Sequence, residues 1–355
     1  MNSAAARLLA ATHRESVDAT PVWFMRQAGR SLPEYRALRQ GLSLLEMVRR
    51  PELCAEVTCM PVDLLGVDAA VLFADIMLPL EGMGIPFEIQ EGVGPVVGEP
   101  IRSRAQVERI RVVAAEEATP YLFKAIRLAR AQLGERAALI GFAAAPFTLA
   151  CYLVEGRGSR DYPHVRALMH DQPELWHQLM ATLTEVLSRY LMAQAQAGAQ
   201  LVQVFDSWVG VLSAVAFQRH VAPHLARLFS ELAPRVPALY FSTGSSHLLA
   251  EIAATGAPGV SLDWRLPLDR AWRQLGRDRF IQGNLDPALV LCSWDVLKPA
   301  AEAVLKQVGG RPGHIFNLGH GVLPDSDPDQ LRRLVDLVHS FDVGAAGDLQ
   351  EREGG

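Results

Sequence analysis

Pro21-Val22-Trp23-Phe24-Met25-Arg26-Gln27-Ala28-Gly29-Arg30 begins as a short apolar run and then breaks into a polar loop that contains a glycine. The run is typical of a buried strand. The loop carries two guanidinium groups four residues apart, which suggests an anion site. Three of the 34 basic residues are lysines, which leaves 31 arginines. In such a chain these two arginines could equally be ordinary surface residues on a strand-to-helix loop. The residues at the other strand ends are needed to choose between an anion site and a surface loop.

Seven more apolar runs follow, and each ends in polar or glycine residues before a helical pattern begins. They cover residues 69–75, 137–142, 200–205, 238–241, 259–262, 279–282 and 314–318. Alternating strands and helices imply a parallel sheet with helices on its faces. Eight such units favour one closed (β/α)8 barrel, a TIM barrel of the α/β class. A doubly wound sheet is the alternative, but it would normally carry G-x-G-x-x-G after its first strand, and residues 26–30 do not.

The remaining patterns describe additions to this barrel. An N-terminal helical extension is expected over residues 4–12, and helical periodicity over 31–65 is interrupted at Pro51 and Pro61. Residues 85–99 alternate and are rich in Gly and Pro, which predicts a small hairpin after the second strand. The loop after the third strand is expected to carry Pro146, Thr148 and Tyr152, and long helices are expected over 161–197. We expect one catalytic domain over residues 1–342 and a frayed tail over 343–355.

The composition fits a soluble globular enzyme with a large core. Half of the 355 residues are hydrophobic and 21% are charged. A net charge of -5 argues against a general nucleic-acid or membrane-surface binder. Residues 1–11 lack a sustained apolar segment, so neither a signal peptide nor a membrane span is expected. The cysteines show no zinc-ribbon or disulfide pattern, so we expect them reduced in a cytoplasmic protein: Cys54, Cys59, Cys151 and Cys292.

In a (β/α)8 barrel the active site lies at the carboxyl ends of the strands. The polar residues at these ends are therefore expected to converge on one mouth: Arg26, Arg30, Asp75, Tyr152, Asp206, Ser207, Asp263, Asn284, Asp286 and His320. Guanidinium groups suit carboxylate ligands because their planar forks bind both oxygens. Asp75 could offer a fixed negative charge there, and a loop or helix-capping carboxylate is the alternative.

Several chemistries lack their residues. No G-x-x-x-x-G-K-[ST] loop is present, and no lysine sits at a strand end for Schiff-base chemistry. Ser207 lies in Asp-Ser-Trp rather than in a G-x-S-x-G elbow. His220 and His224 are four apart, but no Glu of H-E-x-x-H lies between them. We expect no metal and no cofactor.

At this point the residues resemble a known family. Residues 23–30, continued by Leu32-Pro33-Glu34-Tyr35-Arg36, closely resemble the N-terminal signature of the uroporphyrinogen decarboxylases. The resemblance extends along nearly the whole chain. Further matching segments are Phe73-Ala74-Asp75-Ile76, residues 141–156, Phe205-Asp206-Ser207-Trp208, residues 282–287 and Asn317-Leu318-Gly319-His320-Gly321.

The resemblance implies a cofactor-independent barrel, a homodimer, that acts on uroporphyrinogen in haem biosynthesis. The four acetate side chains of this tetrapyrrole would become methyl groups, giving coproporphyrinogen and carbon dioxide. Arg26 and Arg30 would bind substrate carboxylates, with Gln27 beside them, and Asp75 would accept hydrogen bonds from the pyrrole N–H groups. The other substrate contacts implied are Tyr152, Phe205, Ser207 and His320.

The implied chemistry suits these residues. Protonation of a pyrrole ring creates a cationic electron sink for loss of carbon dioxide, and Asp75 would stabilise that cation. A positioned acid must also supply protons. Arg26 is the candidate, although Arg holds its proton tightly, and a bound substrate carboxyl or water is the alternative.

Some positions depart from the family pattern without replacing a residue of assigned role. They are Ser31, Ala74, Phe147 and residues 243–246. Two alternative functions remain. A zinc-dependent corrinoid or thiol methyltransferase relative would need a His-x-Cys near the fifth strand, and residues 240–247 contain no Cys. A non-catalytic tetrapyrrole-binding relative would be free to lose Asp75, which is present.

Overall fold

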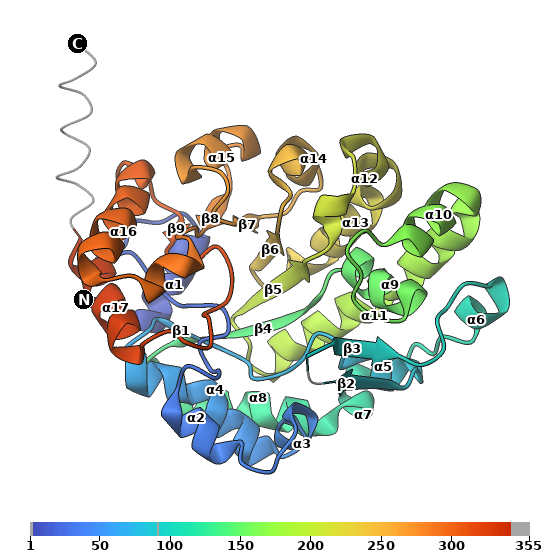
Figure 1. Ribbon diagram of the computed structural model, residues 1–355, viewed down its shortest axis with the longest axis horizontal. Coiled ribbons are helices and arrows are strands. Elements are labelled where there is room, and N and C mark those ends of the chain that lie inside the picture. Colours follow the sequence, from blue (N-terminus) through green and yellow to red (C-terminus); the bar gives the residue numbers. More distant parts are fainter. Residues whose placement is uncertain (1–2, 91, 342–355) are drawn as a thin grey trace.

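The computed structural model describes residues 3–90 and 92–341, and its centre is a parallel sheet of seven strands. The strands lie in the order β1-β4-β5-β6-β7-β8-β9, and Figure 1 shows the sheet curled with helices around it. This confirms the predicted α/β barrel. The strands are β1 (Ala69–Val71), β4 (Ala138–Ala144), β5 (Leu201–Asp206), β6 (Ala238–Ser242), β7 (Gly259–Ser261), β8 (Phe280–Gln282) and β9 (His314–Ile315).

Helices precede, separate and follow these strands. They are α1 (Ala4–Thr12), α2 (Pro33–Leu38), α3 (Leu44–Val48), α4 (Pro51–Leu65), α5 (Pro79–Met83), α6 (Arg104–Glu108), α7 (Ala115–Ala118), α8 (Pro120–Leu133), α9 (Pro146–Glu155), α10 (Pro163–Asp171), α11 (Pro173–Ala197), α12 (Ala214–His220), α13 (Ala222–Leu232), α14 (Leu249–Ala254), α15 (Leu268–Leu275), α16 (Trp294–Val308) and α17 (Pro328–Ser340), with short 3-10 turns η1 (Val209–Val211), η2 (Ser246–Leu248) and η3 (Pro287–Leu291). Within the described residues, none of these helices combines the length and the apolar character that a membrane crossing requires.

Residues 21–24 close the barrel between β9 and β1. On one side the Phe316 N–H donates to the Pro21 carbonyl at 2.8 Å, and on the other the Asp68 N–H donates to the Val22 carbonyl at 2.8 Å. Val22 and Phe316 form an isolated parallel bridge rather than a strand. The first predicted strand is therefore much shorter than expected, because Pro21 has no N–H to donate and the chain turns at Met25.

The barrel interior contains a buried polar layer beneath the mouth. The Trp23 indole Nε1 donates to Gln282 Oε1 at 2.8 Å, and Gln282 Nε2 donates to Ser261 Oγ at 2.9 Å. Gln203 Nε2 lies 3.5 Å from the Met25 sulfur. Buried polar groups are costly unless they are paired, so this layer holds residues 23–25 in one position.

Of two predictions about the elements around the barrel, one is confirmed and one is wrong. The hairpin is confirmed, since β2 (Phe87–Gln90) pairs antiparallel with β3 (Gly94–Val97). The predicted interruption at Pro61 is wrong, because this proline lies inside α4. The N-terminal extension α1 is present and packs against β1, β4 and β9. The expected tail over residues 343–355 lies outside the described residues.

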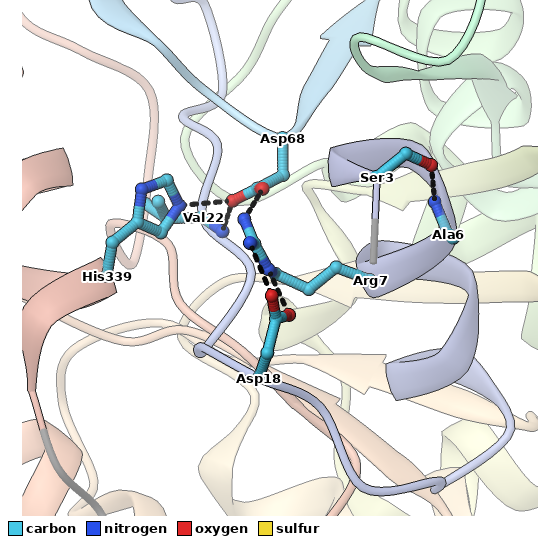
Figure 2. A network of polar contacts seen from close by, with 7 residues as sticks. All are labelled: Ser3, Ala6, Arg7, Asp18, Val22, Asp68 and His339. Atoms are coloured by element: carbon cyan, nitrogen blue, oxygen red, sulfur yellow. Dashed lines mark hydrogen bonds and ion pairs between the residues drawn. The ribbon is translucent and has the colours of Figure 1, made fainter. Parts of the chain in front are cut away.

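A second polar cluster lies at the amino ends of the strands, opposite the mouth, and Figure 2 shows it. The Asp68 carboxylate is buried and accepts hydrogen bonds of 2.7 Å from the Val22 N–H and from Arg7 Nη1. It also lies 2.7 Å from His339 Nε2 on α17. Arg7 is paired in addition with Asp18, from Nε to Oδ1, at 2.9 Å. One carboxylate thus joins α1, the closing segment, the start of β1 and the last helix.

Candidate active site

Arg26 is held at the mouth in an uncommon backbone conformation. Its φ is +58°, in the left-handed region that non-glycine residues rarely adopt. The loop after β9 supports it: the Val322 N–H donates to the Met25 carbonyl at 2.8 Å, and Met25 donates its N–H to Asn317 Oδ1 at 3.2 Å. The Arg26 side chain covers Gly321 so closely that a Cβ there would lie 2.5 Å from Arg26 Cδ. Such strain is most often retained where function requires it.

Gln27 lies beside Arg26 but points into the protein. It is fully buried, its Nε2 donates to the Ala69 carbonyl at 2.8 Å, and its Oε1 accepts the Phe24 N–H at 2.9 Å. These bonds bind the closing segment to β1. Arg30, by contrast, is exposed, and its carbonyl accepts a 2.9 Å bond from Arg36 Nη1.

Asp75 follows β1 and is partly open to solvent. One carboxylate oxygen, Oδ1, accepts the Met77 N–H at 2.9 Å, so the loop-carboxylate interpretation holds for that oxygen. Burial raises the pKa of Asp75, and the Met77 N–H and the nearby Arg26 charge oppose this shift. The Asp75 carboxyl is thus held by one backbone bond at the strand end, close to the Arg26 charge.

Tyr152, on helix α9, lies within electrostatic reach of this carboxylate. The prediction that Pro146, Thr148 and Tyr152 lie on a loop is wrong, because α9 begins at Pro146, directly after β4. Proline suits the first helical position, where an N–H would be unpaired. Burial raises the pKa of Tyr152 to about 12, and the charges of Asp75 and Arg26 act on it as well. Its phenol therefore keeps its proton at neutral pH.

Phenylalanine rings from β4, β5 and β6 form an apolar wall. The Phe205 ring contacts Phe142 and Phe241 edge-on, with centroids 5.5 and 5.7 Å apart. Phe241 in turn contacts the His320 ring at 6.0 Å. Burial, with Arg26 and Arg265 nearby, lowers the pKa of His320 to about 4. A neutral imidazole at the end of an apolar wall can exchange hydrogen bonds with a ligand but does not supply a positive charge at neutral pH.

Other strand-end carboxylates belong to the scaffold. Asp206 is buried and accepts bonds from Thr148 Oγ1 at 2.8 Å and the Tyr240 hydroxyl at 2.7 Å. Burial raises the pKa of Asp206 to about 6. Asp286 accepts the Ala288 N–H at 2.9 Å at the start of η3. Ser207, directly after Asp206, is half-buried.

Sequence reasoning missed two neighbours of the site. Trp208 lies beside Tyr152, with ring centroids 6.1 Å apart, and Arg265 lies near His320. Trp208 stands in a quoted family segment, so its position was a usable signal. Arg265 gave no usable signal, because arginine is abundant in the chain.

His220 and His224 pack with a third histidine away from the mouth. His177 Nδ1 lies 2.9 Å from His224 Nε2, and the His177 ring stacks on both others. Within residues 3–90 and 92–341, no three His, Cys, Asp or Glu side chains are arranged to hold a metal. A hollow of about 600 Å³ near these histidines is lined by Arg102, Gln172 and residues of α10, and it contains none of the site residues.

Comparison with known proteins places these features in a family. The sequence model of uroporphyrinogen decarboxylase (URO-D) matches residues 3–341. The uroporphyrinogen decarboxylase of Sorangium cellulosum is 51% identical over 94% of this chain and 96% of its own. That of Carboxydothermus hydrogenoformans is 47% identical over 94% of this chain and 95% of its own. Among solved structures, a methyltransferase from Methanosarcina mazei has a TM-score of 0.80 at 22% identity, covering 99% of this chain and all of its own, which shows a shared fold alone.

Proposed function

The chain belongs to the uroporphyrinogen decarboxylase family, and we propose that it converts the four acetate side chains of uroporphyrinogen III to methyl groups. The products are coproporphyrinogen III and four molecules of carbon dioxide, and no cofactor takes part. The observation that carries this proposal is the position of Asp75. It lies at a strand end, near enough to Arg26 and Tyr152 for their charges and pKa values to interact.

Binding begins with the arginines. Arg26 and Arg30 bind carboxylates of the substrate, and the apolar wall around Phe205 supports the face of the macrocycle. Tyr152 and the neutral His320 contribute hydrogen bonds, and Ser207 lies beside them. We assign Gln27 to positioning, because its amide is committed to backbone groups below the mouth. That is a narrower role than direct contact with the substrate.

Asp75 acts on the pyrrole nitrogens. Its second carboxylate oxygen accepts their N–H bonds, and it stabilises the positive charge that appears when a ring carbon takes up a proton. The C–C bond to the acetate carboxylate then breaks. Its electrons neutralise the ring cation and leave an exocyclic methylene, and carbon dioxide departs.

Two proton movements complete each round. The methylene carbon takes up a proton to become a methyl group, and the ring carbon loses the proton that it gained first. Each acetate therefore exchanges carbon dioxide for one proton. We assign proton delivery to the Arg26 position, either from the guanidinium or from a substrate carboxyl or water that it binds.

The state of the cysteine thiols supports this proposal over the thiol methyltransferase alternative. Burial raises the pKa of Cys54 and Cys59 to about 12, and it raises that of Cys151 well above its ordinary value. A metal ligand or nucleophile needs a thiolate instead. We further propose a single catalytic domain over residues 1–342, a cytoplasmic location and a homodimer, as the family resemblance implies.

The deciding experiment is anaerobic incubation with freshly reduced uroporphyrinogen III, after exhaustive treatment of the protein with a chelator. Products are separated by chromatography according to their number of carboxylates. We expect intermediates with seven, six and five carboxylates, followed by coproporphyrinogen. If only the eight-carboxylate substrate is recovered, the proposal is wrong.

A further inference from the structure

Arg265 extends from the loop after β7, two residues beyond the strand-end carboxylate Asp263. Its Nη1 lies 2.6 Å from Asp263 Oδ2, and its backbone N–H donates to Asp263 Oδ1 at 3.0 Å. The Gly244 N–H, from the loop after β6, also donates to Oδ2, at 2.6 Å. Asp263 is buried, whereas the Arg265 side chain is 49% exposed. The guanidinium is thus anchored at one end and open to solvent at the other.

The indole of Trp264 fixes the guanidinium from a second direction. Arg265 Cζ lies over this ring, 4.2 Å from its centroid, which is the geometry of a cation–π contact. A flexible side chain loses less freedom on binding when it is already held in place. Arg265 is therefore better prepared to bind a ligand than an ordinary surface arginine.

The loop that carries Arg265 packs directly against the loop that carries His320. A Cβ at Gly319 would lie 2.5 Å from the Trp264 backbone nitrogen, so the two backbones touch. The charges that act on His320 are those of Arg26, Arg265 and Asp263. His320 thus lies within electrostatic reach of both Arg26 and the Asp263–Arg265 pair.

We propose that Arg265 is a third carboxylate-binding arginine of the mouth, on the loop that packs against the His320 loop, and this inference rests on the proposed function. Uroporphyrinogen carries eight carboxylates, whereas the chain as a whole has a net charge of -5. Binding then depends on local positive charge, and Arg26 and Arg30 lie together on one loop. Asp263 binds one nitrogen of the Arg265 guanidinium, Nη1, and the other guanidinium nitrogens remain for a substrate carboxylate.

The test compares Arg265→Gln and Arg265→Lys with Arg270→Gln, an equal loss of charge at an exposed position on the outer helix α15. For uroporphyrinogen decarboxylation we expect Arg265→Gln to raise KM about tenfold or more, as loss of a charge-assisted hydrogen bond does. We expect kcat to stay within about threefold of wild type, because binding is lost without loss of the reacting groups. Arg265→Lys should recover part of the KM, and Arg270→Gln should leave both constants unchanged.

Two readouts make the result independent of turnover. Equilibrium binding of uroporphyrin, the oxidised octacarboxylate, should weaken by a similar factor in Arg265→Gln only. NMR titration should show the pKa of His320 rising in this variant, because a nearby positive charge has been removed.

Each result has a distinct meaning. A wild-type protein that binds uroporphyrin through Arg265 but releases no carbon dioxide would refute the proposed function alone. If the wild-type protein is active but Arg265→Gln leaves KM and the affinity for uroporphyrin unchanged, this inference alone is refuted. A smaller rise in KM for Arg265→Gln than for Arg270→Gln would also overturn it.

Discussion

Replacing Asp68 by Asn should weaken the closure of the barrel without touching the mouth. The carboxylate accepts 2.7 Å bonds from the Val22 N–H and Arg7 Nη1 and lies 2.7 Å from His339 Nε2. Asn is nearly isosteric, but it loses the charge and turns an N–H₂ group toward one of these partners. The stability effect is therefore a direct measure of this cluster.

The magnitude follows from burial and from what remains paired. Removing one partner of a buried ion pair costs about 3–5 kcal/mol. Arg7 keeps its contact with Asp18, and its side chain is 14% exposed, so the lower end applies, about 3 kcal/mol. With an unfolding entropy of about 2.1 cal/mol/K per residue, a chain of this length loses about 4 °C in Tm.

Urea unfolding, followed by tryptophan fluorescence and circular dichroism, measures the free energy of unfolding. The control is Asp63→Asn, which breaks a half-exposed pair with Arg136 at the same end of the barrel. It should cost less than about 1 kcal/mol, as surface pairs usually do. Turnover at saturating substrate should be unchanged in both variants. A loss of under about 1 kcal/mol for Asp68→Asn, or equal losses for the two variants, would refute the reasoning.

Three further predictions concern the mouth and the response to acid. Asp75→Asn should fold normally but lose turnover about a hundredfold or more, because the charge that stabilises the cation is gone; Asp286→Asn, at another strand end, is the steady-state control and should stay active. Gly321→Ala should raise KM about tenfold with little change in Tm, since the new Cβ would displace the Arg26 side chain; a normal KM would contradict the contact. The free energy of unfolding should fall as pH falls from about 6.5 to about 4 in urea titrations. Burial lowers the pKa of His224, His314 and His320 to about 4 while their unfolded pKa values stay near 6.5, so the unfolded chain binds these three protons first. Asp206, whose pKa is raised to about 6, acts in the opposite sense and offsets part of this fall. His314→Gln should reduce this dependence, and an unchanged pH profile would contradict the assignment.

The strands were predictable because the barrel core leaves their sequences uniformly apolar. The lengths of the strands were less predictable. Residues 21–24 read as a strand as good as any other, yet they form one bridge, because hydrogen bonding there depends on Asp68 and Phe316, far away in the chain. Pro61 inside α4 shows the same limit, since packing outweighs a local helix breaker.

The candidate site was predictable in its residue types more than in its geometry. The resemblance pointed to Arg26 and Asp75, and the structure brings them within electrostatic reach. The resemblance could not show that the Gln27 side chain points into the protein, because a glutamine in a loop is equally compatible with solvent, ligand or backbone partners. Tyr152 was placed on a loop although Pro146, a frequent first residue of helices, marked the start of α9.

The closing segment has a consequence for how the protein is made. Arg26 is positioned by Asn317, Gly321 and Val322, which a ribosome adds nearly three hundred residues later. A nascent chain can stack its middle helices and strands early, but its arginine loop has no support until the last strand emerges. A circular permutant opened on the hairpin between β2 and β3 would begin at β3 and end with the original N-terminal segment, so the arginine loop would be made after its support instead of long before it. In such a permutant the arginine loop would meet a support that is already made, whereas in the natural order it waits for the last strand.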